Sequence, residues 1–231
     1  MVQVNSTPLT LRIKFTKVGN LQYISHLDLV RTMNKIVVRA SLPLWYTEGF
    51  NPKPKMVFAA PLSIGCESLT EYMDIRLTER MDPEEIMKRL NDNLTEEMRV
   101  VEAYYPETKL TELQWLKYDI VIKTGGANEA LLERMRASLS RDEIKITKRS
   151  KKGEVVADIR PLIKSFELSL VGEEIKLEAI LSADQSKFLN PEYLISSLRE
   201  DTGILSDSNI LNEYYSIMRV SALKDDLSDF R

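Results

Sequence analysis

The chain holds a single histidine, His26, which lies between the oxygen-bearing side chains of Ser25 and Asp28. A histidine in such company could act as a general base. The same residues also fit a helix start. Ser-x-x-Asp ahead of an apolar run is a variant of the capping box, in which Ser25 accepts a hydrogen bond from the amide of Asp28. We therefore interpret the segment as a helix start and keep His26 as the candidate catalytic residue.

A row of basic residues follows on the same predicted helix. Arg31, Lys35 and Arg39 recur every four residues, so they share one helix face. A second face is apolar and is expected to be buried; it carries Leu29, Met33, Ile36, Val37 and Ala40. Alone, the basic row is typical of a solvated surface.

The loop after this helix changes that interpretation. In WYTEGFNPKPK, residues 45–55, aromatic side chains including Phe50 stand among Lys53 and Lys55. Aromatic faces beside flexible cations suit unpaired bases and phosphates. The other interpretation is that Trp45 and Tyr46 belong to a strand of the core. The sequence leaves both open.

Charge is unevenly distributed along the 231 residues, which carry a net charge of −3. Residues 10–60 hold eight basic and two acidic side chains, a local charge of +6, so the remainder carries −9. A basic segment on an acidic protein indicates a local anion-binding surface.

Composition excludes several classes of protein. Hydrophobic residues make up 43% and charged residues 29%, which is typical of soluble globular chains. We expect no membrane segment and no secretory signal. Since Cys66 is the only cysteine, we expect a reducing, cytoplasmic location and no iron–sulfur cluster. With one cysteine and one histidine, no metal or other cofactor is expected.

Hydrophobic periodicity predicts strands and helices in a repeated order. In the first half we expect strands at 11–16 (resuming at 21–24), 42–46, 56–61, 72–77 and 98–104, and helices at 25–40 and 82–94. In the second half we expect strands at 116–123, 144–148, 155–159, 166–170, 174–181 and 214–222, and helices at 128–139 and 190–200.

This order predicts an α+β protein of two tandem ferredoxin-like (β-α-β-β-α-β) domains with antiparallel sheets. The boundaries are 1–108 and 109–231, and the joint lies near 106–114. The alternative is one larger α+β domain. In the second half, Asp158 and Arg160 alternate with apolar residues before Pro161. This pair could be structural or could bind an anion.

Several motifs together resemble a known family. They are SHLD (25–28), RASLP (39–43), GFNPKPK (49–55), PLSIGCES (61–68), ADIRP (157–161) and YYSIMRV (214–220). The chain resembles the radical-SAM-linked (radical-SAM-associated) protein family, a domain family of unassigned function. The resemblance implies a cobalamin-binding radical SAM protein as partner. With one cysteine, this chain cannot itself be a radical SAM enzyme.

The resemblance carries over to positions that match the motifs: Lys17, Gly19, Ser25, His26, Asp28, Arg31, Arg39, Gly49, Phe50, Asn51, Pro52, Lys55, Gly65, Glu67, Ser68, Asp158, Arg160 and Pro161. The chain departs from the family at Lys53, where a histidine is usual. A lysine there weakens any mechanism that needs two histidines, but it keeps a cation that suits an anion.

Three functions remain open. The first is an accessory protein that binds RNA or another phosphate-bearing substrate in a basic groove for a radical SAM partner. The second is a metal-independent endoribonuclease-like enzyme using His26, and the third is a pure protein-docking module. We expect His26 and the loop at 51–55 to line one pocket. The candidate binding residues are Lys17, Ser25, His26, Asp28, Arg31, Lys35, Arg39, Phe50, Asn51, Lys53, Lys55, Glu67, Asp158 and Arg160.

Overall fold

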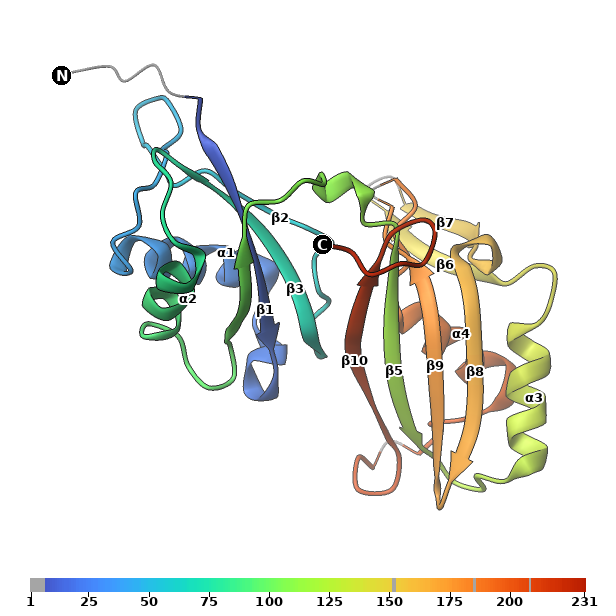
Figure 1. Cartoon of the computed structure of the whole chain (residues 1–231). Helices are drawn as coiled ribbons and strands as arrows, with labels where there is room; N and C mark the ends of the chain where they lie inside the picture. Colours follow the sequence, from blue (N-terminus) through green and yellow to red (C-terminus); the bar gives the residue numbers. More distant parts are fainter. Residues whose placement is uncertain (1–6, 151–152, 185, 208) are drawn as a thin grey trace. The chain divides into compact units, whose positions relative to one another are not determined.

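The computed structural model describes residues 7–150, 153–184, 186–207 and 209–231. The chain forms two compact units (Figure 1). The first is Met1–Leu113 together with Phe230–Arg231, and the second is Gln114–Asp229. Both units combine antiparallel strands with helices, which confirms the predicted α+β class. None of the helices in the described residues is long and apolar enough to cross a bilayer.

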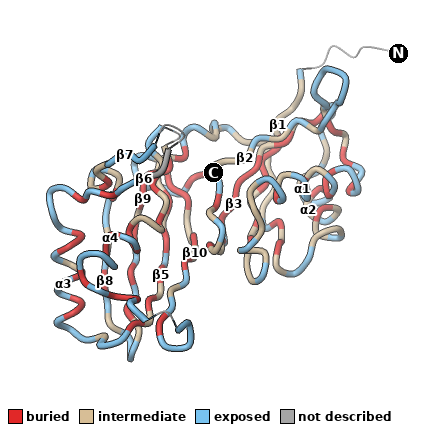
Figure 2. The backbone as a smooth tube through the Cα atoms, turned by 180° about the vertical axis from the view of Figure 1, so that it is seen from behind, coloured by how far each residue is buried: buried red, intermediate tan, exposed pale blue. Residues whose placement is uncertain are grey.

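The first unit is a four-stranded antiparallel sheet with two helices. Strand β1 lies between β4 and β3, and β2 pairs with the other edge of β3. Buried stretches follow β1 and β3 in Figure 2. In chain order the elements are β1 (Leu9–Lys17), α1 (His26–Arg39), β2 (Met56–Phe58), β3 (Cys66–Leu77), α2 (Pro83–Asn91) and β4 (Val100–Tyr104).

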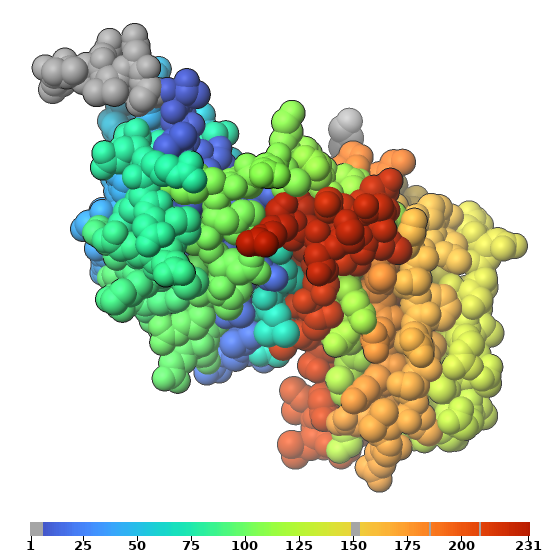
Figure 3. Space-filling view, in the orientation of Figure 1, coloured from blue at the N-terminus to red at the C-terminus, as the bar shows by residue number. Residues whose placement is uncertain are grey.

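The second unit has a sheet of strand order β10-β5-β9-β8, also antiparallel, and a separate two-stranded hairpin of β6 and β7. The orange atoms of β8 and β9 lie at the surface in Figure 3, so none of the described helices covers this face of the sheet. The elements are β5 (Trp115–Lys123), α3 (Glu129–Leu139), β6 (Lys145–Ser150), β7 (Gly153–Asp158), β8 (Ile163–Val171), β9 (Glu174–Ser182), α4 (Glu192–Thr202) and β10 (Tyr214–Leu223).

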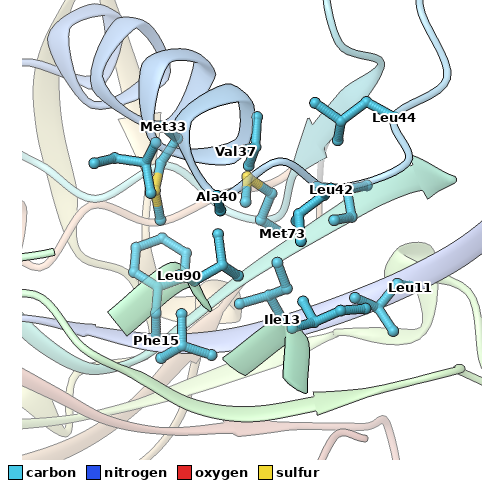
Figure 4. Packing of buried hydrophobic residues seen from close by; sticks show 14 of the residues in the cluster. Leu11, Ile13, Phe15, Met33, Val37, Ala40, Leu42, Leu44, Met73 and Leu90 are labelled. Atoms are coloured by element: carbon cyan, nitrogen blue, oxygen red, sulfur yellow. The ribbon is translucent and has the colours of Figure 1, made fainter. Parts of the chain in front are cut away.

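The core of the first unit forms because β1 alternates. Leu11, Ile13 and Phe15 are fully buried on one face of the sheet. They pack with residues of the two helices, including Met33 and Leu90 (Figure 4). Each such side chain contributes about 1.5–3 kcal/mol on burial. The cluster therefore fixes α1 on the sheet and determines which of its faces remains in solvent.

Four predicted elements differ from the structure. Residues 42–46 form only isolated bridges, Leu44 to Leu77 and Tyr46 to Pro54, and are no strand. Residues 19–23 are a short 3-10 helix, so the first strand does not resume at 21–24. Strand β3 begins at Cys66, earlier than the expected residue 72. Strand β2 stops at Phe58, ahead of Pro61, whose nitrogen cannot donate a ladder hydrogen bond.

Candidate nucleic-acid interface

The N-terminus of α1 is capped by the side chain of Ser25. The Ser25 Oγ accepts a hydrogen bond from the amide of Asp28 at 3.1 Å and donates to its Oδ2 at 2.7 Å. The hydrogen bond from the Ser25 hydroxyl to the Asp28 carboxylate lowers the pKa of Asp28, and Arg31 lowers it by a smaller amount. Since a capped helix start already carries a carboxylate, Ser25 and Asp28 position the helix and are not a free anion site.

The basic row lies on the solvent side of α1. Arg31, Lys35 and Arg39 are exposed, whereas the apolar face of the helix is buried. Arg31 forms an ion pair with Asp28 at 3.3 Å. Within the described part of the chain, neither Lys35 nor Arg39 forms an ion pair. These cations therefore have no internal carboxylate to neutralise them.

Residues 46–54, which we call the 46–54 loop, leave the edge of the sheet and return to it. The Trp45 amide donates to the carbonyl of Arg76 at 2.8 Å, and the Arg76 amide donates to the carbonyl of Lys55 at 3.0 Å. The Lys55 amide donates to the carbonyl of Trp45 at 2.9 Å and closes the neck. Residues 46–53 are drawn as exposed in Figure 2. The loop is therefore a projection anchored at both ends by β3.

The tip of the 46–54 loop presents an aromatic side chain to solvent. Gly49 has φ +122°, a conformation that strains residues with a Cβ atom. Phe50 follows it and is fully exposed, and Asn51 is exposed as well. The glycine thus turns the chain so that the Phe50 ring finds no neighbours in the core.

Two hollows of about 520 and 510 Å³ lie between α1 and the 46–54 loop. They share Asn34, Lys53 and Pro54, so we treat them as one basic groove. The first hollow is also lined by Arg31, Lys35, Val38, Arg39, Tyr46 and Pro52. The second is also lined by His26, Val30, Thr47, Lys55, Met56, Val57 and Phe58. Among these described lining residues there is no Asp or Glu.

His26 lies at one end of the basic groove. Its ring meets the ring of Phe58 edge to face, with centroids 5.5 Å apart at 88°. It lines the same hollow as Lys53 and Lys55, whereas Asn51 is not a lining residue of either hollow. The helix start and the 46–54 loop thus meet at this end of the groove, as two walls of one space.

Lys17 and Glu67 lie away from the groove lining. Lys17 is only 2% exposed, and its Nζ donates to the carbonyl of Cys66 at 3.5 Å. Glu67 accepts a hydrogen bond from the amide of Gly19 at 2.6 Å. Both residues therefore hold the junction between β1 and α1, and their place in the motif is explained by structure.

Asp158 and Arg160 belong to the second unit and bind backbone groups there. The Asp158 carboxylate accepts from the amides of Ile144 and Arg160, both at 2.9 Å, and these bonds lower its pKa. The Arg160 side chain donates to the carbonyl of Ile163 at 3.1 Å. The pair thus fixes the base of the β6–β7 hairpin; residues 151 and 152, between its two strands, lie outside the described residues.

Sequence reasoning missed Asn34 in the basic groove. Its amide nitrogen donates to the carbonyl of Val30 at 2.8 Å, while its buried Oδ1 has no hydrogen-bond partner in the described structure. Helical spacing could have indicated it, because Asn34 lies three residues after Arg31 and so beside the basic row.

A second missed feature is a buried ion pair on the other face of the same sheet. The Arg12 guanidinium donates two hydrogen bonds to the Asp74 carboxylate, at 2.7 and 3.0 Å. Its Cζ also lies 4.8 Å from the centroid of the Phe230 ring. Burial lowers the pKa of Arg12, but the hydrogen bond and charge of Asp74 raise it more. Burial also raises the pKa of the adjacent Tyr104 to about 12. This cluster stabilises the sheet and has no link to the groove lining.

Comparisons with known proteins define the family and the fold. Residues 10–191 match the model of a family described as "Uncharacterized protein conserved in bacteria (DUF2344)". No curated protein matches the chain in sequence. The solved "Crystal Structure of a Cbf5-Nop10-Gar1 Complex" includes a chain that is 13% identical, with a TM-score of 0.51 over 94% of this chain and 50% of that one. This similarity supports an α+β fold, and the present chain spans about half of that chain's length.

A second structural similarity is weak. An unknown protein from Galdieria sulphuraria is 10% identical, with a TM-score of 0.27 over 93% of this chain and 99% of that one.

Proposed function

The chain belongs to this family of uncharacterized bacterial proteins, and we propose that its basic groove binds single-stranded RNA as an accessory to a cobalamin-binding radical SAM protein. The observation that carries the proposal is that five cations from two separate segments line the groove, with no acidic residue among its described lining residues. They are Arg31, Lys35 and Arg39 from α1, Lys53 from the 46–54 loop, and Lys55 directly after this loop.

Electrostatics favours a polyanion as ligand. Lys35, Arg39, Lys53 and Lys55 are exposed, and they form no ion pair within the described residues. Unneutralised cations on two facing walls raise the local concentration of anions. A nucleic-acid backbone meets this requirement, because it carries one phosphate per nucleotide and releases counterions on binding.

Aromatic side chains favour unpaired bases over a duplex. Tyr46 lines the groove and is 43% exposed, and Phe50 stands free at the loop tip. Exposed rings are costly in water and gain free energy when a base stacks on them. Bases of a duplex are already stacked on one another, so a flexible single strand fits this surface better.

The radical SAM partner rests on the resemblance of the motifs. Co-purification of the tagged full chain with a cobalamin-binding radical SAM protein from the same cell tests this part. Recovery of that protein at stoichiometric amounts supports the accessory role, and its absence at low and moderate salt removes it while leaving RNA binding in place.

We also infer that each unit is a ferredoxin-like domain. The orders β4-β1-β3-β2 and β10-β5-β9-β8 support this inference, because each places the first of its four sheet strands next to the third and the fourth, with the β6–β7 hairpin counted apart from the sheet. An experimental structure with a different strand order in either unit would overturn it.

The test of RNA binding is a fluorescence titration of a labelled RNA octamer at several salt concentrations. If about four phosphates are neutralised, log K falls against log salt with a slope near about −3. Arg31→Ala, Lys35→Ala or Lys55→Ala each flatten the slope by under about one unit. Arg134→Ala, which removes an exposed cation of α3, is the matched control and leaves the slope unchanged.

No binding at low salt, or wild-type slopes in all three groove variants, would remove the RNA proposal. The exposed groove would then be assigned to protein docking, the third function open from the sequence.

A second function is favoured by the position of His26. His26 and Lys55 line one hollow, so a bound phosphodiester could lie between them. His26 would act as the general base, and Lys55 would stabilise the negative charge that develops on the phosphate. His26→Ala distinguishes this endoribonuclease from an accessory protein. The accessory protein shows no RNA cleavage before or after the substitution and keeps its affinity, whereas the enzyme shows cleavage that His26→Ala abolishes.

A further inference from the structure

We propose that Asn34 reads one base of the bound RNA and favours a base with an exocyclic amine, so that cytosine is preferred over uracil. This inference rests on the proposed RNA binding and names the ligand chemistry of the same groove. Asn34, Lys53 and Pro54 are the three residues that line both hollows. Asn34 is therefore the central polar group on the helix side of the groove.

The orientation of the Asn34 amide is fixed by the helix. Its Nδ2 donates to the carbonyl of Val30, four residues earlier, at 2.8 Å. This bond uses one of the two Nδ2 hydrogens and directs the nitrogen toward the helix backbone, while Oδ1 remains as an acceptor. A ligand group that pairs with Oδ1 must consequently be a hydrogen-bond donor.

The acceptor is unsatisfied in the free protein. Asn34 Oδ1 is buried and has no partner among the described residues. A buried carbonyl oxygen without a donor is costly, so a ligand donor that reaches it gains more than one exposed to water. Lys53 and Pro54 line the groove opposite it, and Lys53 is an exposed, flexible side chain. The proposal requires that Lys53 move toward a phosphate when RNA binds, so that the base can reach Oδ1.

The groove walls around Asn34 suit the flat faces of a base. Tyr46, Pro52 and Val38 line the first hollow together with Pro54. A hollow of about 520 Å³ with apolar walls is within the range that holds small organic ligands. The surrounding cations supply donors for the carbonyl and phosphate oxygens of a nucleotide, and Asn34 supplies the acceptor.

Cytosine and uracil differ at the position that matters. Cytosine carries an amine at C4, which donates, whereas uracil carries a carbonyl oxygen there, which accepts. An amine directed at Oδ1 forms a hydrogen bond, while a carbonyl leaves two acceptors facing each other. One such bond corresponds to about tenfold in affinity, that is about 1.4 kcal/mol.

The experiment compares labelled octamers of cytidine and uridine by fluorescence titration with the full chain. We expect the cytidine octamer to bind about tenfold tighter, and Asn34→Leu to reduce this ratio to about one. Asn93→Leu is the matched control, because the Nδ2 of Asn93 also donates to a carbonyl four residues earlier, at 3.0 Å, outside the groove lining. It keeps the wild-type ratio.

A thermal melt of the two variants separates reading from folding. Asn34→Leu removes a buried acceptor without a partner and adds a strong helix former, so its Tm stays level or rises. A lower Tm than that of Asn93→Leu, together with an unchanged ratio, would assign Asn34 a structural role and overturn the inference.

Two results distinguish this inference from the proposed function. If both octamers bind equally and with a steep salt dependence, base reading is wrong while RNA binding stands. If neither octamer binds at low salt, RNA binding fails and base reading fails with it.

Discussion

In each unit an additional segment lies between the first helix and the next strand of the sheet, and the two segments differ. In the first unit the 46–54 loop faces the basic row of α1 and encloses the basic groove. In the second unit the β6–β7 hairpin occupies the corresponding place in the chain. Its Lys148 amine lies 5.0 Å from the ring of Tyr193 on α4, and its base is held by Asp158. The same place in the chain order thus holds a groove-forming loop in one unit and a hairpin that contacts α4 in the other.

The two first helices differ in charge as well. Helix α3 carries acids and bases together, and its Arg136 forms an ion pair with Glu133. In α1 the only acid, Asp28, lies in the first turn, and the cations beyond Arg31 remain without a partner within the described residues. Unpaired charge on an exposed helix adds little to stability, so stability does not explain its arrangement on α1, and the proposed RNA binding would use it.

The largest expected effect comes from reversing charge in the groove. Lys35→Glu with Lys53→Glu removes two phosphate contacts and adds repulsion, so RNA affinity falls by about 100-fold or more at 0.1 M salt. The matched double variant in the second unit, Arg134→Glu with Arg199→Glu, changes affinity by less than about threefold. A fluorescence titration measures both, and equal losses would show that the charge of the whole chain, and not the groove, attracts RNA.

The next effect is on stability, at a glycine of each unit that lies before the first α-helix. Gly19 has φ +60°, and a Cβ built on it lies 2.4 Å from the Glu97 carboxylate, whereas Gly126 has φ +70° and nothing within 4 Å. Gly126→Ala therefore costs about 1 kcal/mol of strain, and Gly19→Ala costs about 1 kcal/mol more, because the Glu97 carboxylate must move off the hydrogen bonds it accepts from Asn20. Urea unfolding measures the difference. Similar losses in the two variants would contradict a structural need for close approach at Gly19.

A smaller effect separates stacking from charge at the loop tip. Phe50→Ala lowers RNA affinity by about 1–3 kcal/mol and leaves the salt slope unchanged, because loss of a stacked base releases no counterion. Val156→Ala is the control, because Val156 is an exposed apolar residue of the β6–β7 hairpin in the second unit. The same titration, repeated over salt, tests the pair, and a flattened slope in Phe50→Ala would count against stacking.

The smallest effect is the acid response of the β6–β7 hairpin. Hydrogen bonds from the Ile144 and Arg160 amides lower the pKa of Asp158 below 3.8, its unfolded value. The stabilisation is therefore present above about pH 4 and is lost as pH falls through the lower folded pKa. Hydrogen exchange of residues 144–150 and 153–160, corrected for the intrinsic pH dependence, should accelerate there, and Asp158→Ala should show fast exchange already at pH 7. Wild-type protection in that variant would rule out this role of Asp158.

Much of the groove could be predicted from α1 and its loop. The Ser25 cap and the 3.6-residue period gave the helix and its basic row, because both are local properties of the sequence. The two prolines and Gly49 of the loop disfavour a helix or a central strand there, which is also a local property of the sequence. The missing element was Asn34, whose unsatisfied oxygen depends on which side chains pack over it.

Lys17 shows where a sequence pattern was applied incompletely, whereas Glu67 and residues 42–46 depend on contacts with distant parts of the chain. Lys17 alternates in phase with Leu11, Ile13 and Phe15, so the period of the strand already indicates that it faces the buried side. Glu67 binds Gly19 across 48 positions of the chain, a pairing that no local pattern specifies. The bridges of residues 42–46 likewise depend on β3, since their donors and acceptors lie in Arg76 and its neighbours.

The most direct test of RNA binding in the first unit is ultraviolet cross-linking of the full chain to a single-stranded RNA, followed by mass spectrometry of the cross-linked peptides. RNA that is bound in the groove and stacked on the loop tip gives cross-links at Tyr46 and Phe50, with their loss in the Lys35→Glu, Lys53→Glu double variant. Cross-links confined to peptides of residues 114–229, or unchanged in that variant, would contradict it.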